Sequence, residues 1–299
     1  MDRRKLTALL MVNAKKKGLF FDLLALLKIS SAVLVAVIFS VIGEGDAYFF
    51  TSYFLGGTAV LLLAFSFCRL NGLDFKSETL LKTTDKKNYI LALLLLFAML
   101  FGLSGLNGYF IEFLQKFGYK PTEIVLPNFS VANYFLTVIC ICVLPALTEE
   151  IAFRGIILNG VKPSGKIASA VIVGLLFALY HASPAQTVYQ FAVGFLFALL
   201  AIKSGSVLPT VIVHFLNNFI IINLNYSTGG SLDFGNALNA VFTALGVLAT
   251  GAFLYFTLKN GEEKTETSFS SSWLIISNFL KYAVLGIIAY GVLWIFSLK

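Results

Sequence analysis

The 299-residue chain carries charge on only 12% of its residues, whereas 58% are hydrophobic, and its mean hydropathy is +0.88. Soluble domains have about a quarter charged residues, so this composition excludes a water-soluble globule. The net charge of +7 does not indicate nucleic-acid binding, because the basic residues form short clusters between apolar runs and not one basic face. The composition therefore predicts an all-α, polytopic membrane protein.

Nine apolar stretches approach or exceed the roughly 20 residues that a helix needs to cross a bilayer. In chain order they are Leu23–Ile42, Phe49–Cys68, Asn88–Leu106, Val131–Gly160, Ile167–Ala182, Thr187–Lys203, Val207–Asn225, Asn236–Leu258 and Ser272–Leu298. The first is too long for a signal-peptide core and is expected to stay as an anchor. Between the third and fourth stretches, Tyr109–Phe117 has the spacing of a short amphipathic helix at the membrane surface. We expect a transmembrane bundle of about eight or nine spans.

The connecting segments alternate in charge along the chain. Basic residues occupy the N-terminus and the connections after the second, fourth, sixth and eighth stretches, whereas those after the first, fifth and seventh contain none. The third connection is mixed, since Lys116 and Lys120 are offset by Glu112 and Glu123. Positive charge concentrates on cytoplasmic loops. The pattern predicts a cytoplasmic N-terminus in a plasma membrane, and the short loops favour a bacterial one.

The fourth stretch contains ionisable residues, which cost on the order of 2.5–3.5 kcal/mol each at the centre of a membrane helix. Glu150 and Arg154 are four residues apart, so they share a helix face and can pair. Glu149 is rotated by about 100° from Glu150 and must face another partner. Taken alone, the three residues fit equally well a structural ion pair with Glu149 as a bystander.

The only two histidines of the chain, His181 and His214, also lie in apolar stretches. A single histidine in such a helix is more often a hydrogen-bonded packing residue than a catalyst. Two histidines and a carboxylate pair on three nearby stretches indicate instead a buried polar site. At about 1.5 Å per residue, their heights differ by about two helical turns, so a tilted or broken helix is needed to bring them together. Prolines at 145, 184 and 209 can supply such bends.

Three motifs in these stretches together resemble the CPBP family, which comprises the type II CAAX prenyl endopeptidases and their bacteriocin-processing and immunity (Abi) relatives in bacteria. The family pattern is Glu-Glu-x-x-x-Arg, then Phe-x-x-x-His, then His-x-x-x-Asn or Asp. The matching residues are Glu149, Glu150 and Arg154, then Phe177 and His181, then His214 and Asn218. The resemblance divides the chain into N-terminal transmembrane helices and interfacial segments (1–130), a catalytic core (131–225) and C-terminal transmembrane helices (226–299).

The resemblance implies an intramembrane endopeptidase. Glu149 would act as the general base on a water that His181 also holds, and His214 with Asn218 would stabilise the oxyanion. Glu150 and Arg154 would fix the helix behind them. The expected partners are the lipid bilayer and a peptide or protein substrate: a prenylated C-terminal peptide in eukaryotic relatives, a peptide precursor or membrane segment in bacteria.

Three alternatives remain open. Glu149, His181 and His214 form the ligand set of a zinc site, although no His-Glu-x-x-His motif is present, and a metal-free mechanism is favoured. A non-proteolytic scaffold or immunity protein could retain the fold, but it would have no need to keep two histidines in lipid. A transporter with a proton relay would also explain buried Glu and His, but the inverted repeats typical of transporters are not detectable.

Overall fold

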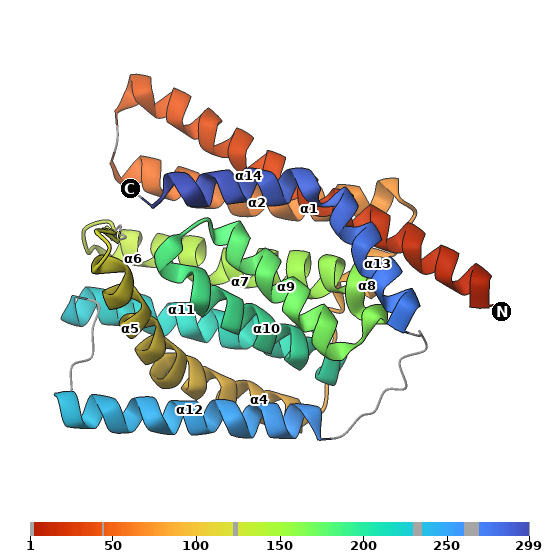
Figure 1. Cartoon of the computed structure of the whole chain (residues 1–299). Helices are drawn as coiled ribbons and strands as arrows, with labels where there is room; N and C mark the ends of the chain where they lie inside the picture. The colour runs from red at the N-terminus through yellow and green to blue at the C-terminus, as the bar shows by residue number, and fades with distance from the viewer. Residues whose placement is uncertain (1–2, 44, 122–124, 230–234, 260–268, 299) are drawn as a thin grey trace.

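The computed structural model describes residues 3–43, 45–121, 125–229, 235–259 and 269–298, and all regular structure in these ranges is helical (Figure 1). Within these described ranges, seven helical segments are long and apolar enough to cross a membrane. An eighth results if α13 (Phe269–Tyr282) and α14 (Val284–Phe296), which meet at an angle of 63°, count as one bent span. The apolar helix α9 (Lys166–His181) is shorter, with 16 residues. The predicted all-α, polytopic bundle is confirmed.

The first helix, α1 (Arg3–Ile42), starts about 20 residues before the predicted span. Its basic residues are therefore helical, and Lys17 is buried, with its ammonium 2.7 Å from the Glu78 carboxylate of α3 (Phe75–Thr79). Such a pair removes the cost of an isolated buried charge. Helix α1 packs against α2 (Asp46–Leu70), α13 and α14, so the first and last helices of the chain lie on the same side of the bundle, with the two termini at opposite ends (Figure 1).

The third span is one continuous helical segment, Lys86–Gln115, made of α4 (Lys86–Phe97), the π-helical η1 (Ala98–Leu103) and α5 (Ser104–Gln115). Most of the predicted amphipathic helix Tyr109–Phe117 is helical and forms the end of α5, continuous with η1. Helix α12 (Asn236–Leu258) crosses this segment closely, since a Cβ on Gly246 would lie 2.5 Å from the Gly102 Cα. This close contact packs the π-helical segment η1 directly against α12.

The fourth span covers 34 residues, Val131–Ser164, and its backbone is not uniformly α-helical. In order it comprises α6 (Val131–Thr137), π-helical η2 (Val138–Val143), α7 (Leu144–Glu149), π-helical η3 (Glu150–Ile157), α8 (Leu158–Val161) and the 3₁₀ turn η4 (Lys162–Ser164). Pro145 lacks an N–H and cannot bond to the carbonyl four residues earlier, that of Ile141. That carbonyl is therefore available to a side chain from another helix.

The centre of the bundle is the hairpin of α9 and α10 (Thr187–Ser204), joined by the turn η5 (Pro184–Gln186). The two helices approach closely because they meet at glycines: a Cβ on Gly194 would lie 2.8 Å from the Gly174 Cα. Helix α11 (Leu208–Thr228) follows beside α10. The fully buried rings of Phe153, Phe177 and Phe197 fill the space between η3 and this hairpin.

Candidate active site

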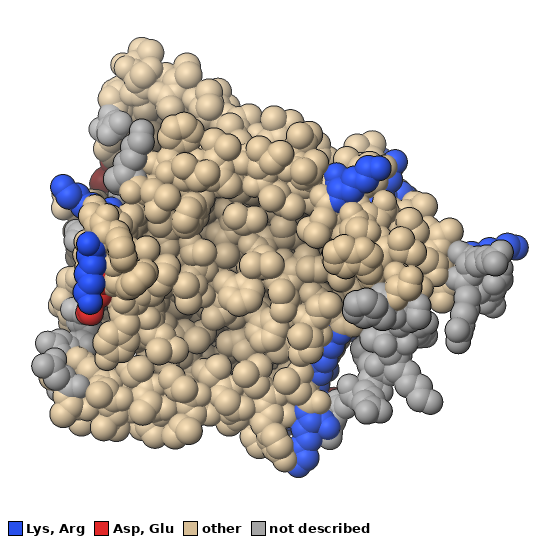
Figure 2. Space-filling view, viewed as in Figure 1, with Lys and Arg blue, Asp and Glu red and all other residues tan. Residues whose placement is uncertain are grey.

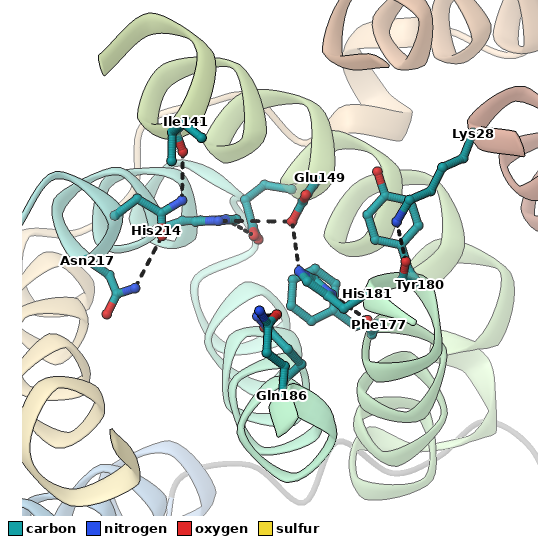
Figure 3. Close-up of polar contacts among 12 residues, drawn as sticks. Lys28, Ile141, Glu149, Phe177, Tyr180, His181, Gln186, His214 and Asn217 are labelled. Carbon is teal, nitrogen blue, oxygen red and sulfur yellow. Dashed lines mark hydrogen bonds and ion pairs between the residues drawn. The ribbon is translucent and has the colours of Figure 1, made fainter. Parts of the chain in front are cut away.

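The first carboxylate of the pair faces both histidines (Figure 3). Glu149 is the last residue of α7, and its Oε2 lies 3.9 Å from His181 Nε2 and 4.0 Å from His214 Nε2. Within the described part of the chain, Glu149 Oε2 makes no hydrogen bond. Its side chain is only 14% exposed. The structure thus brings together three polar groups from three different spans, with the free carboxylate oxygen between two imidazoles.

The second carboxylate joins two basic groups in the interior. Glu150 Oε1 accepts a hydrogen bond from Arg154 Nη1 at 2.8 Å and lies 3.0 Å from His214 Nδ1. The side chains of Glu150 and Arg154 are both fully buried. The guanidinium also lies over the rings of Phe177 (4.2 Å) and Phe197 (4.9 Å), where cation–π attraction favours the charge. The predicted i,i+4 pair exists, and it additionally orients His214.

Each imidazole is oriented through its Nδ1 atom. His181 is the last residue of α9, and its Nδ1 lies 2.8 Å from the carbonyl oxygen of Phe177 one turn earlier. Because a carbonyl only accepts, Nδ1 carries the proton in this contact. The same reasoning gives His214 an Nδ1–H that donates to Glu150. Both Nε2 atoms are thereby directed towards Glu149 (Figure 3).

Asn218 lies one turn after His214 on α11, and its contacts depend on the distorted fourth span. Its Nδ2 donates to the Ile141 carbonyl at 2.9 Å, in the π-helical turn just before Pro145. Its Oδ1 accepts from Asn217 Nδ2 at 3.2 Å. One Nδ2 proton therefore holds α11 against the fourth span, and the other remains available on a side chain that lines the cavity described next.

A cavity of about 830 Å³ gives access to this group. It is lined by residues of α1, α2, α5, α7, α10 and α11 as well as by Glu149, His181 and His214. Its walls mix apolar side chains with hydroxyl and amide groups, such as Ser52, Asn107 and Tyr189. A cavity of this size and lining suits a short peptide segment and water.

Lys28 is a cavity residue that sequence reasoning missed. It belongs to α1, its Nζ donates to the Tyr180 carbonyl, and it lies 3.9 Å from the centre of the Tyr180 ring. Its charge is close enough to Glu149 for the two to attract each other. A cation at a helix C-terminus stabilises the unpaired carbonyls there, so Lys28 holds the end of α9 that carries His181. A lysine inside the apolar stretch Leu23–Ile42 was the available signal.

Gln186 was missed as well. It lies in the turn η5, and Figure 3 shows its side-chain amide pointing towards Glu149 and His181. Its Oε1 accepts from Gln190 Nε2 at 3.3 Å, which orients the Gln186 Nε2 as a donor on the cavity wall. No apolar periodicity or charge distinguishes this residue in the sequence.

The donor types fit zinc, but their positions do not. Zn–N and Zn–O bonds of about 2.0–2.2 Å place tetrahedral ligand atoms about 3.3–3.6 Å apart, whereas Glu149 Oε2 lies 3.9 and 4.0 Å from the imidazole nitrogens. Among the described residues, no group of three or more His, Cys, Asp and Glu side chains is arranged to hold a metal ion.

The fold and the site define a polytopic membrane protein with a carboxylate and two imidazoles converging in a buried cavity. Residues 131–220 match the family model described as type II CAAX prenyl endopeptidase Rce1-like. The matched segment runs from the start of α6 into α11, and the match supports CPBP family membership for this part of the chain. Neither a curated protein nor a solved structure matches the chain. The family indicates protease activity in the membrane.

Proposed function

We propose that the protein is an intramembrane endopeptidase that hydrolyses a peptide bond with a water activated by Glu149. The observation that supports it best is the unpaired Glu149 Oε2 between the Nε2 atoms of His181 and His214. A structural carboxylate in a membrane interior is expected to be paired. One left without a hydrogen bond at the wall of a cavity is suited to bind a water that reacts.

The geometry suits a water bound by Glu149 and His181 together. A water about 2.8 Å from each acceptor spans the 3.9 Å between Glu149 Oε2 and His181 Nε2. Neutral His181 has its proton on Nδ1, so Nε2 accepts. The water then donates both protons, one to the carboxylate and one to the imidazole, and its oxygen lone pair is directed at the substrate carbonyl. Glu149 is the general base in this arrangement.

Whereas His181 helps to bind the water, His214 is proposed to stabilise the oxyanion. Its Nδ1–H is held by Glu150, so Nε2 can donate only when the ring is an imidazolium. Glu149 Oε2 lies 4.0 Å from this Nε2, and Glu150 Oε1 lies 3.0 Å from Nδ1. The Nε2–H of His214 and the remaining Nδ2 proton of Asn218 are the donors proposed for the oxyanion.

The proposed step balances without any further reactant. The water oxygen bonds to the carbonyl carbon while one of its protons passes to Glu149, giving a tetrahedral oxyanion. Collapse of this intermediate breaks the C–N bond, and Glu149 returns its proton to the leaving nitrogen. The products are a carboxylic acid, which keeps the second water proton, and an amine, with Glu149 ionised again for the next cycle.

The test compares peptides released in native membranes by the wild type and by Glu149→Gln, with mass spectrometry as the readout. Glutamine has the shape of glutamate but cannot take a proton, so we expect peptide release to fall about 10²–10⁴-fold, the usual contribution of a general base. Thr83→Ala, placed away from this site, is the matched control and should release peptides like the wild type. Equal release by Glu149→Gln would refute the assignment.

The same preparation separates the alternatives. The proposal expects active protein to hold no stoichiometric zinc and to keep its activity after treatment with a strong chelator. Loss of activity on chelation, with recovery on adding zinc, would instead support the metal-dependent version with Glu149, His181 and His214 as ligands. A scaffold or immunity protein would release the same peptides with either residue at position 149.

A further inference from the structure

The cavity lies towards one end of the bundle. Its outer residues include Tyr48 and Ser52 near the beginning of α2, Ile111 on α5, Leu126 between α5 and α6, and Asn225 near the end of α11. We call this the cavity end, and it carries the connections α1–α2, α5–α6, α9–α10 and α11–α12. From these residues the cavity extends inward to Glu149.

The opposite end of the bundle holds most of the positive charge. This basic end comprises the first half of α1, the connections α2–α4, α8–α9 and α10–α11, and the end of α12. Hydrogen bonds join these segments: Lys166 Nζ donates to the Thr257 carbonyl at 2.6 Å, and Thr84 Oγ1 donates to the Ser204 carbonyl at 2.9 Å. Its described basic residues include Lys5, Lys15, Lys16, Lys17, Arg69, Lys76, Lys82, Lys86, Lys87, Lys162, Lys166, Lys203 and Lys259.

The cavity end has few basic residues, and acidic residues balance them. On its described connections and the adjoining helix ends, Lys116 and Lys120 are the basic residues, and Asp46 and Glu112 are acidic. Figure 2 shows basic atoms near the start of α1 and at the end of α12, a smaller basic and acidic group at the other end, and an uncharged surface between them. This uncharged surface is the belt expected to face lipid.

The cavity does not extend to the basic end. None of its lining residues belongs to a connection of that end. The space between the site and the basic end is filled by Phe153, Phe177 and Phe197, each at most 1% exposed, and by the buried Glu150–Arg154 pair. Within the described structure, the cavity therefore gives no access to Glu149 from the basic end.

We propose that the cavity opens to the side of the membrane away from the cytoplasm. Lys and Arg concentrate on cytoplasmic connections, so the basic end is cytoplasmic and the cavity end is not. Resting on the proposed function, this identifies the substrate class as polypeptide segments that have already crossed the membrane: exported chains, external loops, or the external ends of membrane anchors. Cytoplasmic peptides are excluded because their path to Glu149 is closed.

Cysteine labelling tests the orientation independently of catalysis. Asn225→Cys and Ser52→Cys place a thiol at the cavity end, and Lys87→Cys places one at the basic end, where the lysine side chain is 72% exposed. The native cysteines at 68, 140 and 142 are buried and give a low background. In intact cells, a membrane-impermeant maleimide should label Asn225→Cys and Ser52→Cys, whereas Lys87→Cys should react only in inverted vesicles. The reverse pattern would overturn the proposal.

A second measurement concerns the substrate. Peptides that depend on Glu149 should accumulate in the medium of intact cells expressing the wild type, and be missing with Glu149→Gln. Their accumulation inside the cell would overturn the inferred substrate class. Correct labelling with no Glu149-dependent peptide on either side would refute the proposed function and leave the orientation standing, so the two failures are distinguishable.

Discussion

Replacing Glu150 with glutamine removes one charge from a buried pair and preserves the shape of the side chain. Glu150 Oε1 accepts from Arg154 Nη1 at 2.8 Å, and both side chains are fully buried. The substitution leaves the guanidinium without its counter-charge. Removing one partner of a buried ion pair costs about 3–5 kcal/mol, so we expect Glu150→Gln to lower the free energy of unfolding by that amount.

The neighbouring residue provides the matched control. Glu149 Oε2 is buried and accepts no hydrogen bond from the described residues, so Glu149→Gln removes a carboxylate that is poorly compensated. A buried carboxylate oxygen without a hydrogen bond adds little to stability, because desolvation opposes the attraction of Glu149 to charges such as Lys28. Glu149→Gln should therefore be as stable as the wild type or more stable, although we expect it to lose most of its activity. Two identical substitutions at adjacent positions should thus differ by at least about 3 kcal/mol.

The assay is equilibrium unfolding in mixed detergent micelles, followed by the fluorescence of Trp273 and Trp294. The unfolding midpoint of Glu150→Gln should shift to lower denaturant while the slope stays constant, which indicates a change in stability alone. If Glu150→Gln and Glu149→Gln unfold at the same midpoint, the Glu150–Arg154 pair does not stabilise the bundle, and our reasoning about the two carboxylates is refuted.

Two further predictions concern the helices that hold the site. Lys28→Met should reduce peptide release about tenfold with little change in folding, because displacing a catalytic group such as His181 by about 1 Å can lower the rate up to 10²-fold. Lys28→Arg should restore part of the activity. Unchanged release by Lys28→Met would rule out a positioning role. Gly194→Ala should lower the free energy of unfolding by about 1–3 kcal/mol through overpacking, because the added methyl meets α9 at Gly174. Gly251→Ala, whose Cβ would meet nothing within 4 Å, is the control and should unfold like the wild type.

The fold class follows from composition and hydropathy, because a chain so poor in charge can satisfy its backbone in lipid only with helices or a closed barrel. The Glu150–Arg154 pair follows from spacing, since residues four apart share a helix face. The helical rotation of about 100° per residue also predicts that Glu149 points away from the Glu150–Arg154 pair. The two histidines were recognisable because each is an ionisable residue in an apolar stretch. The chain contains no other histidine.

Contacts between helices could not be read from any local pattern. Glu150 bonds to His214, 64 residues away, and Asn218 bonds to the Ile141 carbonyl, 77 residues away. Pro145 predicts an unpaired carbonyl at Ile141, but only the packing of α11 decides what fills it. Lys28 reaches Tyr180 across 152 residues.

Hydropathy and spacing show which side chains are costly in lipid, and therefore which must meet a partner or a cavity. The tertiary structure alone decided which partners they meet, that both imidazoles direct Nε2 at Glu149, and at which end the cavity opens. The physical reason is that hydropathy and helical period are local properties, whereas helix tilt, rotation and close approach at glycines depend on packing between segments distant in the chain.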